Sequence, residues 1–578
     1  MNQVSDTPVS HPQWRPYLAA ALALLTTSQV VSATHSAVDP EVLAAERQRV
    51  EVIRSGSAAA VAIFAGDSGG GSGVLVTPDG YALTNFHVVQ PAGVAMTCGL
   101  ADGRLYEAVL VGLDPTGDVA LVKLLGRADF PCVSLADSDR VEPGDWCFAA
   151  GNPFLLATDL VPSISAGIVS GIHRYQEPAG TILEYTDCIQ VDAAINPGNS
   201  GGGLFDAAGE LIGINGRASF EKRGRVNVGA GYAISANQLR KFMGCLRAGR
   251  VCDHATLGAT VSTAADGRVV VSDILQSSDA WRRGLQYDDE ILALAGRPVR
   301  SVNAFKNVLG TLPAGWQVPL VYRRDGRRTE VLVRLAGVHT QAELTNLVSG
   351  GAGEDDQKNG LGGPAAAPLP EAIHEVFTAR PGYANYHFNM VERDRVARAI
   401  ATRALGHGGT WTLAGRLSDG AEFRIELSDS EGLIDLPTGT SVLDATAALD
   451  ANPVPPGSGG MLAALLLWRR LTLEGPAALG GTSYLGTAPR DPRRLDPAGG
   501  DLVDVLETAV AGVEARFAVD DAGRICGIDL RTSPEADPCE IQISRPGAGG
   551  PLQLDVHHGI ERFGTFLVES VDPAGVVP

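Results

Sequence analysis

The sequence predicts a multi-domain chain with a β-rich N-terminal part, a small β-barrel capped by helices and a C-terminal α+β domain. The chain has 578 residues, whereas a single hydrophobic core usually stops growing at roughly 250 to 300 residues. Short apolar strands separated by turn residues recur up to about residue 335, and a Gly-rich, charged stretch then interrupts the pattern. We therefore expect three domains.

The chain is acidic, with a formal net charge of −20. A general nucleic-acid-binding protein carries a basic face that neutralises phosphates. The composition therefore argues against a nucleic-acid partner.

Residues 1–33 have the features of a secretory signal peptide. Arg15 precedes an apolar run from Tyr17 to Leu25, and the small residues Val31-Ser32-Ala33 form a cleavage pattern. The run is short for a membrane span, although an uncleaved anchor or a buried helix remains an alternative. We expect export to the periplasm or beyond, with a mature N-terminus near Thr34.

The sequence contains 8 cysteines, an even number that permits disulfides in an exported protein. Cys245 with Cys252 and Cys526 with Cys539 are close enough in sequence to be plausible pairs. Buried free thiols are the alternative.

The first catalytic candidate follows a helix and several strands. Asp39 and Pro40 predict a helix start, and the strand AAAVAIF comes after that helix. The run GSGVLVTPDGYALTNFHVV then predicts two strands joined by a Pro-Asp-Gly turn. His87 lies where the second strand ends.

Two aspartates in DPTGDVALVKL are candidates to serve this histidine. Asp114 precedes a proline in a turn, where capping of the turn is the expected role. Asp118 begins an apolar run, so its carboxylate should lie near the core, where it can orient an imidazole. We choose Asp118.

Ser200 in DAAINPGNSGGGL is the candidate nucleophile. Small residues around it allow backbone N–H groups to converge on an oxyanion. A similar string around Ser458, PPGSGGM, has no other catalytic residue type near it.

His87, Asp118 and Ser200 occur in the order found in chymotrypsin-type double β-barrels. The segments GSGVLVTPDGYALTNFHVV, DVALVKL, GNPF and IQVDAAINPGNSGGGL also resemble the HtrA (DegP/DegS) serine proteases in order and spacing. This resemblance extends over residues 55 to 245. It implies an all-β chymotrypsin-like protease domain over residues 39–250 and no cofactor.

The resemblance also implies roles for individual residues. Ser200 would attack a peptide carbonyl, His87 would transfer the proton and Asp118 would hold the imidazole. Backbone N–H groups of Gly198, Asn199 and Ser200 would bind the oxyanion. The stretches 151–171 and 216–235 look like regulatory and substrate-pocket loops.

Two further features concern substrate choice and the strand after the nucleophile. Ile195 and the strand Ile214-Asn215-Gly216 look apolar, which predicts small aliphatic P1 residues such as Val, Ala or Leu. Gly203 departs from the proline or alanine more often found in the family, and we expect it to loosen this strand.

Residues 255–337 resemble the PDZ domain that follows HtrA proteases, a β-barrel with short helices. The resemblance implies that N–H groups around Leu257, Gly258 and Ala259 bind a peptide C-terminal carboxylate while the peptide adds as a strand. A packing module that binds no peptide is the alternative.

Residues 338–371 are predicted to be a flexible linker, and residues 372–578 a C-terminal α+β domain. We expect a helix near 391–405, strands TWTLAGRL and EFRIEL, a buried helix from Met461, an amphipathic helix DLVDVLETAVAG and further strands. The strand order faintly resembles LolA-type lipoprotein carriers, which suggests a lipid or protein partner. No metal site is expected there.

Together these features predict an exported serine endopeptidase that cleaves unfolded or damaged envelope proteins and recognises peptide C-termini. A homotrimer is possible by the resemblance. The rival prediction is a non-enzymatic, chaperone-like scaffold with a resting protease fold. A cytoplasmic enzyme is a third possibility.

Overall fold

The computed structural model describes residues 38–65, 70–152, 159–176, 183–220, 227–348, 369–402, 409–496, 498–533, 536–546 and 550–572. The predicted signal peptide lies outside these residues. The chain divides into two units, residues 1–50 and 51–578. Within the described residues, no helix combines the length and apolar character that a membrane crossing requires.

The predicted first helix is α2 (Pro40–Ala59), and it begins at the expected position. The Asp39 carboxylate accepts a hydrogen bond from the N–H of Glu41 at 2.9 Å. This side chain satisfies one of the N–H groups that have no partner in the first helical turn.

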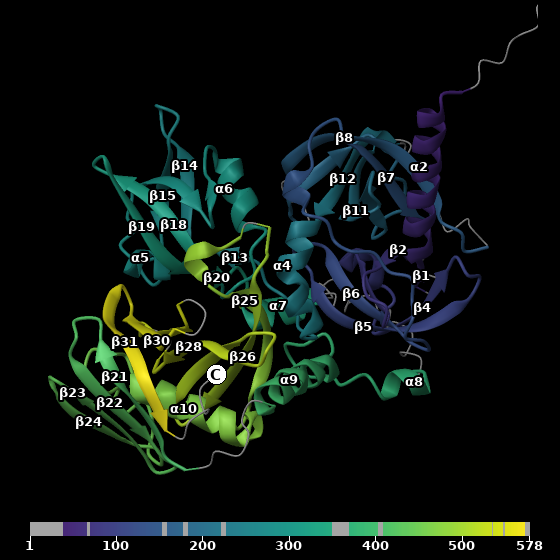
Figure 1. Cartoon of the computed structure of the whole chain (residues 1–578). Helices are drawn as coiled ribbons and strands as arrows, with labels where there is room; N and C mark the ends of the chain where they lie inside the picture. Colours follow the sequence, from purple (N-terminus) through teal and green to yellow (C-terminus); the bar gives the residue numbers. More distant parts are fainter. Residues whose placement is uncertain are drawn as a thin grey trace, which may run out of the picture. The chain divides into compact units, whose positions relative to one another are not determined.

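Two closed antiparallel β-barrels follow, as the sequence predicted (Figure 1). The first has the order β1-β2-β3-β6-β5-β4 and the second β10-β11-β12-β9-β8-β7. The strands of the first are β1 (Ala60–Phe64), β2 (Gly70–Leu75), β3 (Tyr81–Thr84), β4 (Ala95–Leu100), β5 (Leu105–Asp114) and β6 (Val119–Leu124). Those of the second are β7 (Trp146–Gly151), β8 (Ser163–Gln176), β9 (Tyr185–Val191), β10 (Gly203–Asp206), β11 (Leu211–Phe220) and β12 (Asn227–Ser235).

Short helices join and close these barrels. Helix α3 (Phe86–Val89) follows β3, and the 3-10 helix η2 (Ser138–Arg140) lies between the barrels. Helix α4 (Ala236–Arg247) leaves the second barrel and packs on β5 of the first as well as on β11. The two barrels are thereby held as one unit.

The predicted PDZ domain is an antiparallel sheet with two short helices. Its sheet has the order β14-β15-β16-β18-β19, so β14 is an edge strand. The elements are β13 (Ala255–Thr256), β14 (Ala259–Thr263), β15 (Val269–Ile274), α5 (Asp279–Arg282), β16 (Glu290–Leu294), β17 (Arg297–Pro298), α6 (Val302–Leu309), β18 (Gln317–Arg324), β19 (Arg327–Arg334) and β20 (Ala336–Gly337).

Part of the predicted linker is helical. Helix α7 (Gln341–Val348) lies in it, and α8 (Glu371–His374) begins at its end. Helix α9 (Tyr386–Ala401) is the helix expected near 391–405, and it starts earlier than expected. Asn385 caps it, accepting the N–H of His387 at 3.2 Å.

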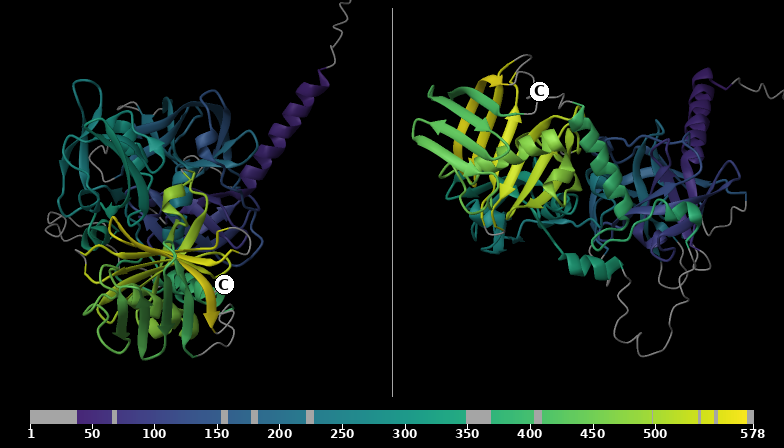
Figure 2. Two further views of the ribbon diagram at one scale, coloured as in Figure 1. Left: turned by 60° about the vertical axis from the view of Figure 1, so that its left-hand side comes forward. Right: turned by 90° about the horizontal axis from the view of Figure 1, so that it is seen from below.

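The C-terminal domain is one antiparallel sheet that curves around helix α10 (Met461–Glu474), as Figures 1 and 2 show. The strand order is β24-β23-β22-β21-β31-β30-β29-β28-β27-β26-β25. The strands are β21 (Trp411–Leu417), β22 (Glu422–Leu427), β23 (Glu431–Leu436), β24 (Gly439–Asp444), β25 (Ser483–Pro489), β26 (Leu502–Val510), β27 (Val513–Val519), β28 (Ile525–Arg531), β29 (Cys539–Ser544), β30 (Leu552–His558) and β31 (Glu561–Asp572). The prediction of a curved antiparallel sheet with a buried helix is confirmed.

One predicted helix is wrong. The segment DLVDVLETAVAG contains β26, which pairs with β25 on one side and β27 on the other. Backbone hydrogen bonds to both neighbouring strands outweigh the helix-like spacing of its apolar residues.

The edge strand β25 docks on helix α4 of the barrels through glycines. A Cβ atom on Gly244 would lie 2.3 Å from Thr487 Oγ1, and one on Gly486 would lie 2.9 Å from the nitrogen of Cys245. Asn389 of α9 covers the same edge: its side-chain amide donates to the carbonyl of Tyr484 and accepts that residue's N–H. The edge is thus protected from pairing with another chain.

The structure settles the cysteine alternatives. Cys245 and Cys252 form a disulfide, as proposed. Cys526 and Cys539 are free and buried, so that pairing was wrong. The β28–β29 register places Cys539 opposite Leu530 rather than opposite Cys526.

Candidate active site

His87 and Asp118 come together at one end of the first barrel. His87 lies in the short helix α3, directly after β3. Its Nδ1 is 2.8 Å from Asp118 Oδ2 and 3.0 Å from Oδ1. The backbone N–H of His87 donates to Asp118 Oδ1 at 3.0 Å. The carboxylate is fully buried, so it is well placed to fix the imidazole.

The turn between β5 and β6 supplies Asp118 in an unusual conformation, with φ of 58°. Few residues other than glycine adopt this region, so neighbouring groups must hold the turn. Asn85 donates from its side-chain amide to the carbonyl of Asp118 at 2.9 Å. Asp114 accepts the N–H of Gly117 at 2.8 Å, which confirms its predicted capping role.

Tyr185 is a site residue that the sequence analysis missed. Its hydroxyl donates to Asp118 Oδ2 from strand β9 of the second barrel, and the side chain is buried. No local pattern marks this tyrosine, because the contact joins residues 67 positions apart.

The surroundings of His87 favour its protonated form. Burial alone would lower the pKa of His87, but the hydrogen bond and the charge of Asp118 outweigh it and raise the pKa above 6.5. The side chain is still 39% exposed, so an approaching substrate can reach it.

Ser200 lies at the seam between the barrels. Its carbonyl accepts the N–H of Ser72 from the first barrel at 2.8 Å. The next residue, Gly201, donates to the carbonyl of Asn215 in the second barrel at 2.7 Å. The Ser200 hydroxyl donates to the carbonyl of Gly216 at 3.3 Å, and within the described residues it has no hydrogen bond with His87.

The three predicted oxyanion donors are not equivalent. The N–H of Asn199 donates to the carbonyl of Asn196 at 2.9 Å, so it is occupied within the turn. The N–H groups of Gly198 and Ser200 have no hydrogen-bond partner in the described part of the chain. Gly198 has φ of 100°, and Ser72 holds its carbonyl at 2.6 Å. Two donors are therefore available instead of three.

The four predicted pocket residues also differ in their surroundings. Ile214 and Asn215 are fully buried, and the Asn215 amide holds the carbonyl of Gly202 at 2.9 Å, a structural role. Ile195 packs against Gly231, where an added Cβ would lie 2.6 Å from Ile195 Cγ1. The carbonyl of Gly216 accepts the hydrogen bond from the Ser200 hydroxyl. The predicted loops 151–171 and 216–235 lie partly outside the described residues.

Gly203 provides space for an aromatic ring. An added Cβ would lie 2.4 Å from Phe205 Cζ. The Phe205 ring therefore fills the space that a side chain at residue 203 would occupy. This packing explains the glycine without the loosening of the strand that the sequence led us to expect.

The predicted carboxylate loop precedes the PDZ edge strand. Leu257 is buried in the domain core, and Ala259 begins β14. The N–H of Gly258 donates to Thr256 Oγ1 at 3.1 Å. The outer edge of β14 remains open to strand addition within this sheet, and its role in peptide binding stays a prediction.

Asp139, His173 and Asp187 are close enough to hold a metal ion, with ligand atoms within 4.8 Å of one another. Arg297 of the PDZ domain already contacts both oxygens of Asp187 at 2.9 Å. Burial would raise the pKa of Asp187, but hydrogen bonds from His173 and Arg297 lower it to about 2. The group therefore forms an ionic contact between the protease and PDZ domains, and the guanidinium supplies the cation.

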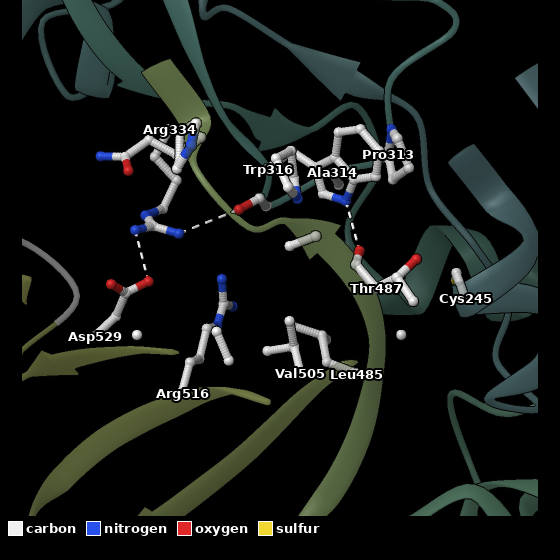
Figure 3. Close-up of a pocket in the computed structure, with 18 of the residues that line it drawn as sticks. Cys245, Pro313, Ala314, Trp316, Arg334, Leu485, Thr487, Val505, Arg516 and Asp529 are labelled. Atoms are coloured by element: carbon white, nitrogen blue, oxygen red, sulfur yellow. Dashed lines mark hydrogen bonds and ion pairs between the residues drawn. The ribbon is translucent and has the colours of Figure 1, made fainter. Parts of the chain in front are cut away.

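A separate cavity of about 350 Å³ lies where the PDZ domain meets the C-terminal sheet and helix α4 (Figure 3). Trp316 donates from its indole to the carbonyl of Thr487 at 2.8 Å. Arg334 reaches Asp529 at 2.7 Å and Glu540 at 3.2 Å. These contacts fix the PDZ domain against the C-terminal sheet. His87, Asp118 and Ser200 are not among the residues that line this cavity.

Comparison with known proteins gives two matching family models. A trypsin-like peptidase domain matches residues 71–214, and a PDZ domain matches residues 255–335. The periplasmic serine endoprotease DegP of Escherichia coli (strain K12) is 34% identical over 304 residues, covering 50% of this chain and 62% of the relative. This half of the chain is similar to periplasmic serine endoproteases of the DegP type.

Two further similarities extend over about the same share of the chain. A probable periplasmic serine endoprotease DegP-like of Chlamydia trachomatis serovar D is 33% identical over 289 residues, covering 48% of this chain and 56% of the relative. A solved HtrA-type protease, AlgW with tripeptide, is 31% identical, with 50% of this chain and 98% of that chain covered and a TM-score of 0.42. The chain spans less than two thirds of the length of these curated relatives.

Proposed function

We propose that this protein is an exported serine endopeptidase that cleaves unfolded or damaged polypeptides. The observation that carries the proposal is the pairing of His87 Nδ1 with the buried carboxylate of Asp118. Ser200, in a Gly-rich turn whose backbone joins the two barrels, supplies the nucleophile. The curated relatives are serine endoproteases with the same peptidase domain. The envelope location rests on the signal-like N-terminus and on the periplasmic relatives.

The proposed reaction is acyl transfer. Ser200 Oγ attacks the peptide carbonyl carbon while His87 takes its proton, and Asp118 stabilises the resulting imidazolium. The oxyanion is bound by the N–H groups of Gly198 and Ser200. His87 then gives the proton to the leaving amine. In the second half of the reaction His87 takes a proton from water, the resulting hydroxide attacks the acyl-enzyme, and His87 returns the proton to Ser200 Oγ as the acid leaves.

We propose that the substrate's P1 residue is small and aliphatic. The support is the apolar Ile195, which is 2% exposed and packs against Gly231. The PDZ domain would bind a peptide C-terminus along β14.

The direct test is the Ser200→Ala variant, assayed for cleavage of a permanently unfolded, carboxymethylated protein. Cleavage should fall by roughly 10⁶-fold if the triad acts as a unit. Ser458→Ala is the matched control, because Ser458 occurs in a similar sequence but its hydroxyl accepts the N–H of Met461 at 3.1 Å at the start of α10. Equal cleavage by wild type and Ser200→Ala would refute the proposal.

A second candidate function is a chaperone-like scaffold with a resting site. The hydrogen bond from the Ser200 hydroxyl to Gly216 instead of His87 favours it. The assay should therefore be repeated with added C-terminal peptides of varied sequence. Cleavage that appears only with peptide indicates a regulated enzyme, whereas no cleavage under any condition supports the scaffold.

A further inference from the structure

Asp114 has a second partner besides the turn that it caps. Both of its carboxylate oxygens lie 2.9 Å from His254 Nε2. The two side chains are almost completely buried, at 0% and 3% exposure. A buried carboxylate and imidazole at this distance form a charge-assisted hydrogen bond.

His254 directly precedes the PDZ domain and does not belong to the strands of the barrels. Its carbonyl accepts the N–H of Val338 at 3.0 Å, and its backbone bridges to Pro313. The next residue, Ala255, donates to the carbonyl of Leu312 at 3.0 Å. These backbone contacts with the PDZ domain therefore fix the position of His254.

The contact is tightly packed against the turn that carries Asp118. A Cβ atom on Gly117 would lie 2.3 Å from Asp114 Oδ2 and 2.8 Å from His254 Nε2. The His254 ring also packs on Phe242 of α4, with ring centroids 4.5 Å apart. Little room remains for Asp114 to shift without moving Gly117 and, with it, Asp118.

We propose that His254 is a positioning residue through which the PDZ domain holds Asp118 beneath His87. His254 fixes Asp114, Asp114 fixes the N–H of Gly117, and the turn then holds Asp118 at its positive φ. The inference rests on the proposed protease function. It makes the alignment of the triad depend on a residue outside the protease barrels.

The test uses full-length protein and measures kcat, KM and the pH profile of kcat/KM on an unfolded substrate. His254→Leu removes the hydrogen bond, and we expect kcat/KM to fall roughly 10- to 100-fold, mainly through kcat, because displacement of a catalytic group by about 1 Å has such a cost. If Asp118 withdraws from His87, the apparent pKa in the profile should also fall. His254→Gln keeps an N–H donor near the Nε2 position and should restore most of the rate and the profile.

The matched control is His339→Leu. His339 forms a similar pair with Asp253, at 2.8 Å. In the part of the chain that the structure describes, neither of these two residues forms a hydrogen bond with the turn 114–118. This variant should leave the pH profile unchanged. If His254→Leu does not fold, Asp114→Asn is the alternative variant. It keeps an oxygen that can accept the Gly117 N–H but weakens the hydrogen bond with His254. It should lower the apparent pKa of the kcat/KM profile.

Three outcomes would overturn the positioning role of His254. A wild-type rate and profile in His254→Leu, or an equal change in His339→Leu, would overturn it. A folded Asp114→Asn protein with an unchanged profile would also overturn it. Absence of cleavage by wild type would instead refute the protease function itself.

Discussion

The Ser200 hydroxyl donates to the carbonyl of Gly216 at 3.3 Å, while His87 Nδ1 pairs with Asp118 at 2.8 Å. Attack on a substrate requires the serine proton to pass to the histidine. A rotation of the Ser200 side chain would redirect its hydroxyl away from Gly216. The base and its orienting carboxylate are in place before this movement.

The pH dependence of cleavage should report on His87. The base must be neutral, and its pKa is raised above 6.5, because the hydrogen bond and charge of Asp118 outweigh the opposing effect of burial. kcat/KM should therefore rise with pH through an apparent pKa above 6.5 and be lost as the pH falls through that value.

The Asp118→Asn variant should reduce kcat by roughly 10⁴-fold, because an amide stabilises the wrong imidazole tautomer. It should also lower the apparent pKa, since burial of His87 then acts without the compensating charge. An unchanged apparent pKa would show that Asp118 is not the partner of the titrating base.

The Tyr185→Phe variant tests the missed contact with Asp118. Phenylalanine keeps the ring that packs under Gly216 but removes the hydroxyl donor. A hydrogen bond to a charged group contributes about 1.5 to 3 kcal/mol, so we expect kcat to fall roughly tenfold or more. A wild-type kcat with normal stability would assign Tyr185 no part in holding Asp118.

The junction between the PDZ domain and the C-terminal sheet should depend on Arg334. Its guanidinium is 11% exposed and contacts Asp529 and Glu540. The Arg334→Met variant removes the arginine that pairs with Asp529 and the nearer of the two that pair with Glu540, whose other partner, Arg283, lies 3.9 Å away. It should destabilise the protein by about 3 kcal/mol in denaturant unfolding.

Arg328→Met provides the control for this measurement. Its partner Glu330 lies 3.5 Å away and both side chains are more than half exposed, at 65% and 57%. The cost should be below about 1 kcal/mol. Equal destabilisation by the two variants would show that the junction adds no stability.

Thiol counting tests the disulfide assignment. Before reduction, the unfolded protein should show six reactive thiols, because Cys245 and Cys252 are paired and the other six cysteines are free. The Cys245→Ala/Cys252→Ala variant should also show six, with stability lower by about 2 to 3 kcal/mol for so short a loop. Four thiols in the wild type would indicate that Cys526 and Cys539 are paired as well.

The sequence was sufficient where a motif or a local pattern carried the information. His87 and Ser200 lie in motifs, and Asp118 was distinguished from Asp114 by the apolar run that follows it. The helix cap at Asp39 and the Cys245–Cys252 pair are local in the chain as well.

The sequence was not sufficient where tertiary contacts decide. Tyr185 contacts Asp118, which lies 67 residues earlier in the chain, and His254 contacts Asp114, which lies 140 residues earlier. The sequence around Tyr185 and His254 contains no pattern that predicts these contacts. The strand β26 was taken for a helix because only its pairing with β25 and β27 reveals its conformation. The occupied N–H of Asn199 likewise depends on how the turn closes on Asn196.

The central claim is that Ser200 is a nucleophile activated by His87. It is tested most directly by treating the folded protein, with an activating peptide present, with a serine-reactive fluorophosphonate and locating the adduct by mass spectrometry. We predict a single adduct on Ser200 in the wild type and none in the His87→Ala variant. An unlabelled Ser200, or labelling that does not depend on His87, would contradict the account.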